Sequence, residues 1–171
     1  MNEEEVVRLR AMEPEDLDLL YRIENDPELW GIGATNVPYS RYTLHDYIAQ
    51  SAGNIYVDGQ VRLIIETARQ GQVVGIVDMV NFDAKNCRAE LGLVIECQYR
   101  RRGYAMSALR QVADYALRVL HLHQLYVYVS STNQPSISLF QKLGYLHTNT
   151  IKDWLFDGQS YTDALLMQKL L

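Results

Sequence analysis

Three consecutive arginines precede a glycine at residues 100–103, which read RRRG. Apolar residues follow at helical spacing over 103–120, so this cluster is predicted to lie where a helix starts. The first turn of a helix presents N–H groups without intrahelical acceptors and a partial positive charge, and both attract phosphate. Arginine adds bidentate hydrogen bonds to anionic oxygens, and glycine removes a side chain that would keep an anion from the backbone. The pattern favours a phosphorylated ligand, with a solvated basic turn as the alternative.

The rest of the chain is acidic. Its 171 residues carry a formal net charge of −5, and the sequence pI is about 5.3. This balance argues against a general nucleic-acid binder and mildly favours cationic partners. We therefore expect no nucleic-acid partner, and the three arginines are not interpreted as an RNA patch.

The sequence also indicates a cellular location. The first residues, MNEEEVVRLR, lack the cationic start and apolar run of a signal peptide. No run of about 18 apolar residues is present, which argues against a membrane-spanning helix. Cys87 and Cys97 have no metal-like spacing and indicate free thiols in a reducing compartment. We expect a cytoplasmic protein without a membrane partner.

Hydrophobic periodicity predicts the elements that must position the arginine cluster. Period-two segments predict strands at 5–11, 61–68, 73–82, 87–95 and 124–131, and a closing hairpin from 145–151 and 160–170. Helical spacing predicts helices at 13–26, 43–52, 103–120 and 134–144, with Thr43 as an N-cap and Asp46 completing a capping box. Residues 26–42 are expected to form a loop. The order β-α-α-β-β-β-α-β-α-β-β predicts a mixed α+β layer sandwich, in a single domain that spans 1–171.

Two motifs in this frame resemble those of the GNAT family of N-acetyltransferases. The family signature is Gln or Arg, two residues, Gly, one residue, then Gly or Ala, and residues 100–105 read RRRGYA. The second motif is an Asn followed by a short amphipathic helix ending in KLG and an aromatic residue, and it is matched by Asn133 and by KLGY at 142–145. The opening RLRAMEPEDLDLLYRIENDPE is similar too, so the likeness covers essentially the whole chain. Within the family it looks nearest to the spermidine/spermine and ribosomal-protein N-terminal acetyltransferases.

The resemblance implies a mostly antiparallel sheet flanked by helices and a binding site for acetyl-CoA as co-substrate. In this family the fourth strand splays from the fifth and frees main-chain groups for the pantetheine arm, which here implicates Leu93, Val94 and Ile95. The backbone at the helix start would bind the pyrophosphate, and Asn133, Ser136 and Phe140 would line the other wall. The residues implicated at the helix start are Arg100, Arg101, Arg102, Gly103, Tyr104, Ala105 and Met106.

The resemblance also implies direct acetyl transfer to an amine, which must be neutral to react. A primary alkylamine with a pKa near 10.4 is neutral about once in 2,500 molecules at pH 7, a cost of roughly 4.6 kcal/mol, whereas an α-amino group loses only about 1 kcal/mol. Glu90 matches a glutamate that often serves as the base in this family. Pairing of Glu90 with Arg88 or another cation is the alternative, and Glu66 and Asp78 are weaker candidate bases.

The sequence departs from the family at Phe140, where many members have a tyrosine that is thought to protonate the departing sulfur. Releasing a thiolate with pKa about 8.5 at pH 7 costs about 2 kcal/mol more than releasing a thiol, so catalysis survives without an acid. Tyr104, Tyr128 and Tyr145 are candidates for a substitute hydroxyl. The general acid stays unassigned.

The acceptor is less well defined. Related polyamine acetyltransferases carry glutamates in the loop that corresponds to 31–42, but this loop reads GIGATNVPYSRY and contains no carboxylate. Trp30, Tyr39 and Tyr42 are candidates for an acceptor pocket or for loop anchoring. Acidic residues lie near this loop in the sequence, namely Glu24, Asp26, Glu28 and Asp46.

Three functions follow from these observations. The first is an acetyl-CoA-dependent N-acetyltransferase for a small amine such as a polyamine, the second acetylates a peptide N-terminus, and the third is a noncatalytic acyl-CoA-binding domain. We expect no metal, because His121 and His123 have no acidic or cysteine partner in the sequence around them and suit a helix C-terminus. A homo-oligomer is compatible with all three functions.

Overall fold

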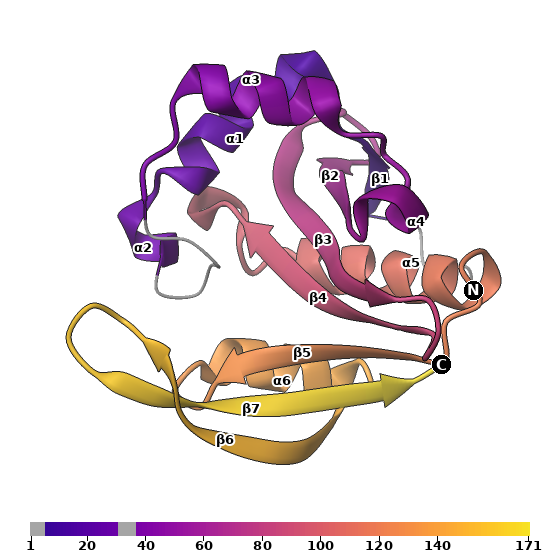
Figure 1. The fold of residues 1–171 in the computed structure, drawn as a ribbon, viewed down its shortest axis with the longest axis vertical. Helices are drawn as coiled ribbons and strands as arrows, with labels where there is room; N and C mark the ends of the chain where they lie inside the picture. Colours follow the sequence, from indigo (N-terminus) through magenta and orange to yellow (C-terminus); the bar gives the residue numbers. More distant parts are fainter. Residues whose placement is uncertain (1–5, 31–36) are drawn as a thin grey trace. The chain divides into compact units, whose positions relative to one another are not determined.

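The antiparallel meander expected over residues 61–95 is present in the computed structural model, which describes residues 6–30 and 37–171 (Figure 1). The chain divides into two units. The first comprises residues 1–12, 53–126 and 169–171, and the second comprises residues 13–52 and 127–168. The expectation of a single domain over 1–171 stays a prediction.

The sheet of the first unit is built from neighbouring strands that pair antiparallel. β1 (Val7–Ala11) pairs with β2 (Val61–Thr67), β2 with β3 (Val73–Asp83), and β3 with β4 (Arg88–Ile95). β5 (Gln124–Ser130) joins β4 as a parallel partner, with Arg88–Glu90 opposite Gln124–Tyr126. A parallel pair needs a long crossover, and here the crossover carries α5 (Tyr104–Arg118).

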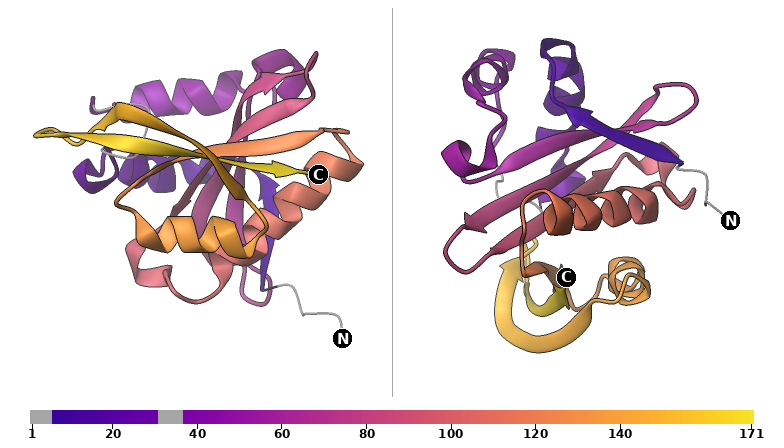
Figure 2. Two further views of the ribbon diagram at one scale, coloured as in Figure 1. Left: turned by 90° about the horizontal axis from the view of Figure 1, so that it is seen from below. Right: turned by 90° about the vertical axis from the view of Figure 1, so that its right-hand side faces the viewer.

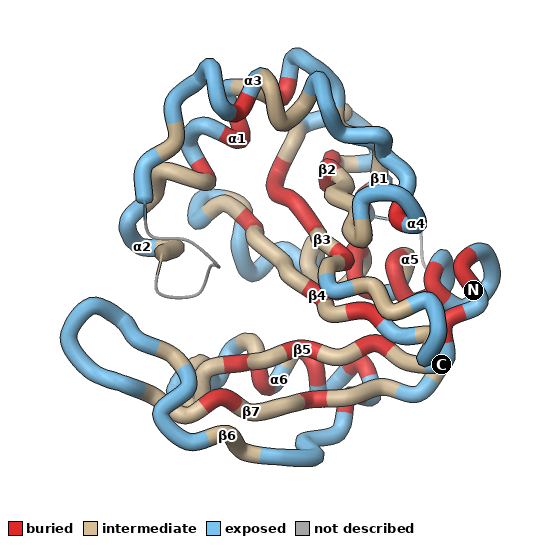
Figure 3. The backbone as a smooth tube through the Cα atoms, in the orientation of Figure 1, coloured by how far each residue is buried: buried red, intermediate tan, exposed pale blue. Residues whose placement is uncertain are grey.

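Helix α5 buries one face because its apolar residues recur at helical spacing. Ala108, Leu109, Val112, Ala113 and Ala116 are all buried. Gln111 Nε2 donates to the carbonyl oxygen of Val7 over 2.7 Å, which fixes α5 to β1. The helix packs on β1, β3 and β4 (Figure 2). The core of this unit also takes buried residues from β3, as the tube coloured by burial displays (Figure 3). The helix start is therefore held on a rigid sheet.

The second unit contains five of the described helical elements and most of the closing hairpin, whereas α4 (Ile55–Asp58) and η2 (Cys97–Tyr99) lie in the first unit. Its helical elements are η1 (Pro14–Asp16), α1 (Leu17–Glu24), α2 (Pro27–Trp30), α3 (Arg41–Gln50) and α6 (Gln134–Lys142). β6 (Leu146–Phe156) pairs antiparallel with β7 (Tyr161–Leu170). Residues 127–130 of β5 also belong to this unit.

The predicted order of elements is confirmed, and the sheet has the strand order β1-β2-β3-β4-β5-β7-β6. The predicted N-cap at Thr43 is wrong. Ser40 caps α3, because its hydroxyl accepts a hydrogen bond from the Thr43 N–H over 3.0 Å. The prediction missed α2, which lies inside the expected loop at 26–42, and α4 (Ile55–Asp58), because four-residue helices leave no readable period.

Across 6–30 and 37–171, none of the helices combines the length and the apolar character needed to cross a bilayer.

Candidate active site

The start of α5 has the geometry that the arginine–glycine motif predicts. Gly103 is the N-cap with φ 81° and ψ −3°, a left-handed conformation that glycine adopts without a steric cost. The N–H of Ser107 donates to Gly103 O over 3.0 Å and closes the first turn. The amides of Tyr104, Ala105 and Met106 precede that bond and so have no intrahelical acceptor. A Cβ on Gly103 would meet no atom within 4 Å, so the backbone there is open to a ligand.

The arginine side chains are oriented by backbone carbonyls near the helix start. Arg100 Nε donates to Ile95 O over 3.0 Å and thereby ties the cluster to the end of β4. Arg102 donates to Gln98 O over 3.1 Å, and its guanidinium lies 5.9 Å from the centre of the Tyr99 ring. Arg101 is exposed and has φ 61°. These contacts concentrate positive charge beside the open amides.

Residues Leu93, Val94 and Ile95 form the end of β4. They lie opposite Val77, Ile76 and Gly75 of β3. The pairing of β4 with β3 continues to Ile95, whereas its parallel pairing with β5 spans Arg88–Glu90. The main-chain role expected of Leu93–Ile95 stays a prediction.

Glu90 is held by an amide rather than by a cation. It lies opposite Val80, and its Oε2 accepts a hydrogen bond from Asn81 Nδ2 over 2.7 Å. Arg88, the cation named in the alternative, pairs with Asp83 at 3.1 Å. The hydrogen-bond donor that contacts the carboxylate of Glu90 is thus a neutral amide.

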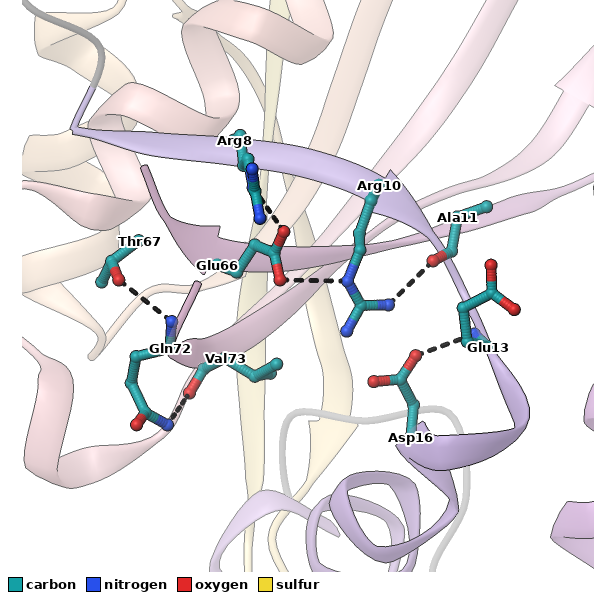
Figure 4. A network of polar contacts seen from close by, with 9 residues as sticks. All are labelled: Arg8, Arg10, Ala11, Glu13, Asp16, Glu66, Thr67, Gln72 and Val73. Carbon is teal, nitrogen blue, oxygen red and sulfur yellow. Dashed lines mark hydrogen bonds and ion pairs between the residues drawn. The ribbon is translucent and has the colours of Figure 1, made fainter. Parts of the chain in front are cut away.

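The weaker candidate bases both lie in ion pairs. Asp78 accepts two hydrogen bonds from Arg62, over 2.8 and 2.9 Å. The buried Glu66 accepts from Arg8 Nε over 2.5 Å and from Arg10 Nε over 3.1 Å (Figure 4). Burial acts to raise the pKa of Glu66, but the hydrogen bonds and charges of Arg10 and Arg8 outweigh it and lower that pKa. These contacts favour a structural role for both carboxylates.

The three residues expected to line the other wall belong to the second unit. Asn133 caps α6, and its Oδ1 accepts from the Ser136 N–H over 3.2 Å. Phe140 is buried, and its ring meets the Tyr145 ring edge-on at a centroid distance of 5.1 Å. Burial raises the pKa of Tyr145, so its hydroxyl stays protonated at neutral pH. Contacts of Asn133, Ser136 and Phe140 with coenzyme A stay predictions.

The acceptor loop is only partly described, because residues 31–36 lie outside the described residues. On either side of them, Trp30 Nε1 donates to Glu24 O, and Asn25 makes two hydrogen bonds with the backbone of Tyr39. Arg41 pairs with Asp18 and lies 4.5 Å from the centre of the Tyr21 ring. The hydrogen bond from Arg41 lowers the pKa of Asp18. These contacts fit loop anchoring for Trp30 and Tyr39.

Sequence reasoning missed Asn81, which is the hydrogen-bond partner of Glu90. Asn81 has φ 50° and lies where the register between β3 and β4 shifts, between Val80 and Asp83. The only signal in the sequence is the residue type, because asparagine adopts positive φ more readily than most residues. Within the described residues, His, Cys, Asp and Glu form no group of three that could hold a metal ion.

Comparisons with known proteins agree with this geometry. The family model described as acetyltransferase (GNAT) domain matches residues 7–146. Spermidine N(1)-acetyltransferase of Escherichia coli K12 is 27% identical over 162 residues, which are 94% of this chain and 84% of that protein. A putative ribosomal N-acetyltransferase of Bacillus subtilis, YdaF, is 26% identical over 168 residues, covering 94% of this chain and 89% of that protein.

Solved structures extend the likeness to the fold. Spermidine N-acetyltransferase of Vibrio cholerae, solved in complex with CoA and spermine, superposes with a TM-score of 0.87 at 23% identity, covering 98% of this chain and 96% of that one. Another structure of that enzyme is dodecameric and superposes with a TM-score of 0.81 at 22% identity, covering 98% of this chain and 95% of that one. These matches confirm the mixed, mostly antiparallel fold.

Proposed function

The chain belongs to the GNAT acetyltransferase family, and on that premise we propose that it transfers the acetyl group of acetyl-CoA to a primary amine, with a polyamine as acceptor. The relatives named for spermidine acetylation support the acceptor class. The net charge of −5 agrees with a cationic acceptor.

One observation carries this proposal: the amides of Tyr104–Met106 are open at the start of a 15-residue helix. Such a helix start binds a pyrophosphate through N–H groups and the helix dipole. The exposed Arg101 and the backbone-oriented Arg100 and Arg102 add charge at the same place. Acetyl-CoA bound there supplies an activated thioester.

The second requirement is removal of a proton from the amine. At pH 7 the deprotonation of an alkylamine costs roughly 4.6 kcal/mol, which a positioned base offsets in part. Glu90 is the proposed base, because a carboxylate can accept a proton and its Oε2 is held at 2.7 Å by Asn81. Phe140 offers no hydroxyl, and without another acid the sulfur leaves as a thiolate, at a cost of about 2 kcal/mol at pH 7.

The experiment is an assay of CoA thiol release against spermidine, spermine, an aminosugar and short peptides. We expect polyamine turnover, and we expect Glu90→Gln to reduce kcat by at least about a hundredfold, the scale of a lost general base. Glu15→Gln removes an exposed carboxylate of η1 and serves as the control. Turnover with no amine would contradict the proposal and favour the noncatalytic acyl-CoA-binding domain.

A peptide N-terminus is the second candidate acceptor. The loop at 31–42 contains no carboxylate to bind a polyamine, and an α-amino group is neutral at a cost of only about 1 kcal/mol. Peptides that outcompete polyamines in the same panel would select this acceptor. Assembly into a homo-oligomer is also proposed, supported by the dodecameric relative from Vibrio cholerae, and light scattering measures it.

A further inference from the structure

We propose that Asn81 is a positioning residue for acetyl transfer, which orients the carboxylate of Glu90 toward the amine through a hydrogen bond to Oε2. This inference rests on the proposed function, because it takes Glu90 as the base. Nothing in the sequence motifs points to Asn81, and it follows from the local geometry of β3.

The geometry begins with a distortion of β3. The pairing register of β3 with β4 is regular from Gly75 to Val80, is interrupted, and resumes at Asp83. Within the interruption, Asn81 has a positive φ of 50°. Irregularities of this kind redirect a side chain, and they concentrate next to active sites. Here the redirected amide reaches Glu90, which pairs with the preceding residue Val80. The 2.7 Å distance between Asn81 Nδ2 and Glu90 Oε2 is that of a strong, charge-assisted hydrogen bond.

The charges around Glu90 are already assigned to other partners. Two residues before Glu90 on β4, Arg88 forms an ion pair with Asp83 of β3. Two residues after Glu90, Gly92 lies opposite Asp78 of β3, and Asp78 forms an ion pair with Arg62 of β2. Tyr126 of β5 is the register partner of Glu90. Each carboxylate of these pairs has its own guanidinium, whereas Glu90 accepts a hydrogen bond from the amide of Asn81.

A neutral donor suits a base better than a cation does. An arginine on Glu90 would stabilise its anionic form and weaken it as a proton acceptor. The amide of Asn81 fixes one oxygen and leaves Oε1 to accept the proton of the ammonium, directly or through water. The neutral amine then forms the C–N bond to the thioester carbonyl, the C–S bond breaks, and its electron pair leaves with the sulfur. The nitrogen loses its second proton to the departing thiolate or to water, which completes the amide.

The test uses two substitutions that both tolerate the positive φ. Asn81→Gly removes the amide and keeps the backbone unstrained. We expect kcat to fall roughly tenfold, less than in Glu90→Gln because the base is retained, with little change in KM for acetyl-CoA. Asn86→Gly is the matched control, since Asn86 Nδ2 makes an equally short 2.7 Å bond in the turn between β3 and β4, but to Asp83. Its kcat should equal that of the wild type.

Asn81→Asp places a second carboxylate against Glu90. The two acids then titrate as a coupled pair, and like-charge repulsion moves the acidic limb of the kcat/KM profile up by about one pH unit. A residue with a purely structural role would not move this limb. The limb should stay in place in Asn86→Gly.

The outcomes separate this inference from the proposed function. If Glu90→Gln abolishes turnover but both Asn81 variants keep the wild-type kcat and pH profile, the positioning role is wrong and the base role stands. A lower melting temperature with kcat per folded enzyme unchanged also overturns the positioning role. If Glu90→Gln retains full activity, both the base role and this inference fail.

Discussion

At the scale of single residues, Glu66 illustrates how pairing overcomes burial. Its side chain is 7% exposed and bridges two arginines of β1 (Figure 4). A carboxylate buried to this degree would protonate if it were alone, but the hydrogen bonds from Arg10 and Arg8 keep it charged and lower its pKa. Glu66 therefore couples the edge strand to the sheet.

This coupling predicts a pH-dependent stability. Because the folded pKa of Glu66 lies below its unfolded value, its contribution is complete above about pH 4.5 and is lost as the pH falls through the folded pKa. Glu66→Gln should lower the free energy of unfolding by about 1–3 kcal/mol at pH 7. Breaking a fully buried ion pair costs about 3–5 kcal/mol, and the loss is smaller here because the Arg8 side chain is 60% exposed. The deficit should shrink toward pH 3. Urea titrations at several pH values measure it.

The control is Glu15→Gln, which makes the same change at an exposed carboxylate of η1. We expect the free energy of unfolding of that variant to lie within about 0.5 kcal/mol of the wild-type value at pH 7. A deficit in Glu66→Gln that is the same at pH 7 and pH 3 would show that the charge of Glu66 does not contribute to stability.

At the scale of elements, the sequence predicts the helices and strands whose apolar residues repeat regularly. It does not predict features that depend on the local backbone or on how two strands pair. The strands and the long helix α5 are predicted because their apolar residues repeat regularly over at least five residues. The cap at Ser40 was missed because both Ser40 and Thr43 are good caps, and only the backbone decides between them. Asn81 was missed because its orientation depends on how β3 and β4 align, which is a long-range property.

Gly75 provides an element-scale prediction. A Cβ at Gly75 would lie 2.1 Å from the carbonyl oxygen of Val94 and 3.1 Å from Ile95 Cα, so β3 and β4 can approach this closely only with glycine. Gly75→Ala must displace backbone, in the segment of β4 that is proposed to bind pantetheine. We expect a loss of about 1–3 kcal/mol, seen as a melting temperature lower by roughly 3–10 °C.

Gly92→Ala is the matched control, since it adds the same methyl group to the same sheet. Its Cβ would lie 3.6 Å from Asp78 Cβ, an ordinary contact, so its stability should change little or rise by about 0.4–1 kcal/mol. Equal melting temperatures for the two variants would refute the idea that close strand approach explains Gly75.

At the scale of the whole molecule, the site residues predicted from the sequence fall in both units. Gly103, Tyr104 and the end of β4 lie in the first unit, whereas Asn133, Ser136 and Phe140 lie in the second. The family motifs identified these residues because each motif has a local backbone requirement, such as the left-handed N-cap at Gly103 or the Asn133 cap on α6. The acceptor site has no such local requirement, so the sequence leaves it open.

Acetyl-CoA binding therefore predicts a response in both units. At a hundred times the dissociation constant, mass action adds about 2.7 kcal/mol to the free energy of unfolding, which corresponds to a rise of roughly 5–11 °C in melting temperature. Hydrogen exchange should slow at the amides of Tyr104–Met106, which have no intrahelical acceptor without ligand, and around Ser136. Stabilisation without slower exchange at Tyr104–Met106 would mean that the pyrophosphate binds elsewhere, because those amides are the donors that the arginine–glycine motif leaves open.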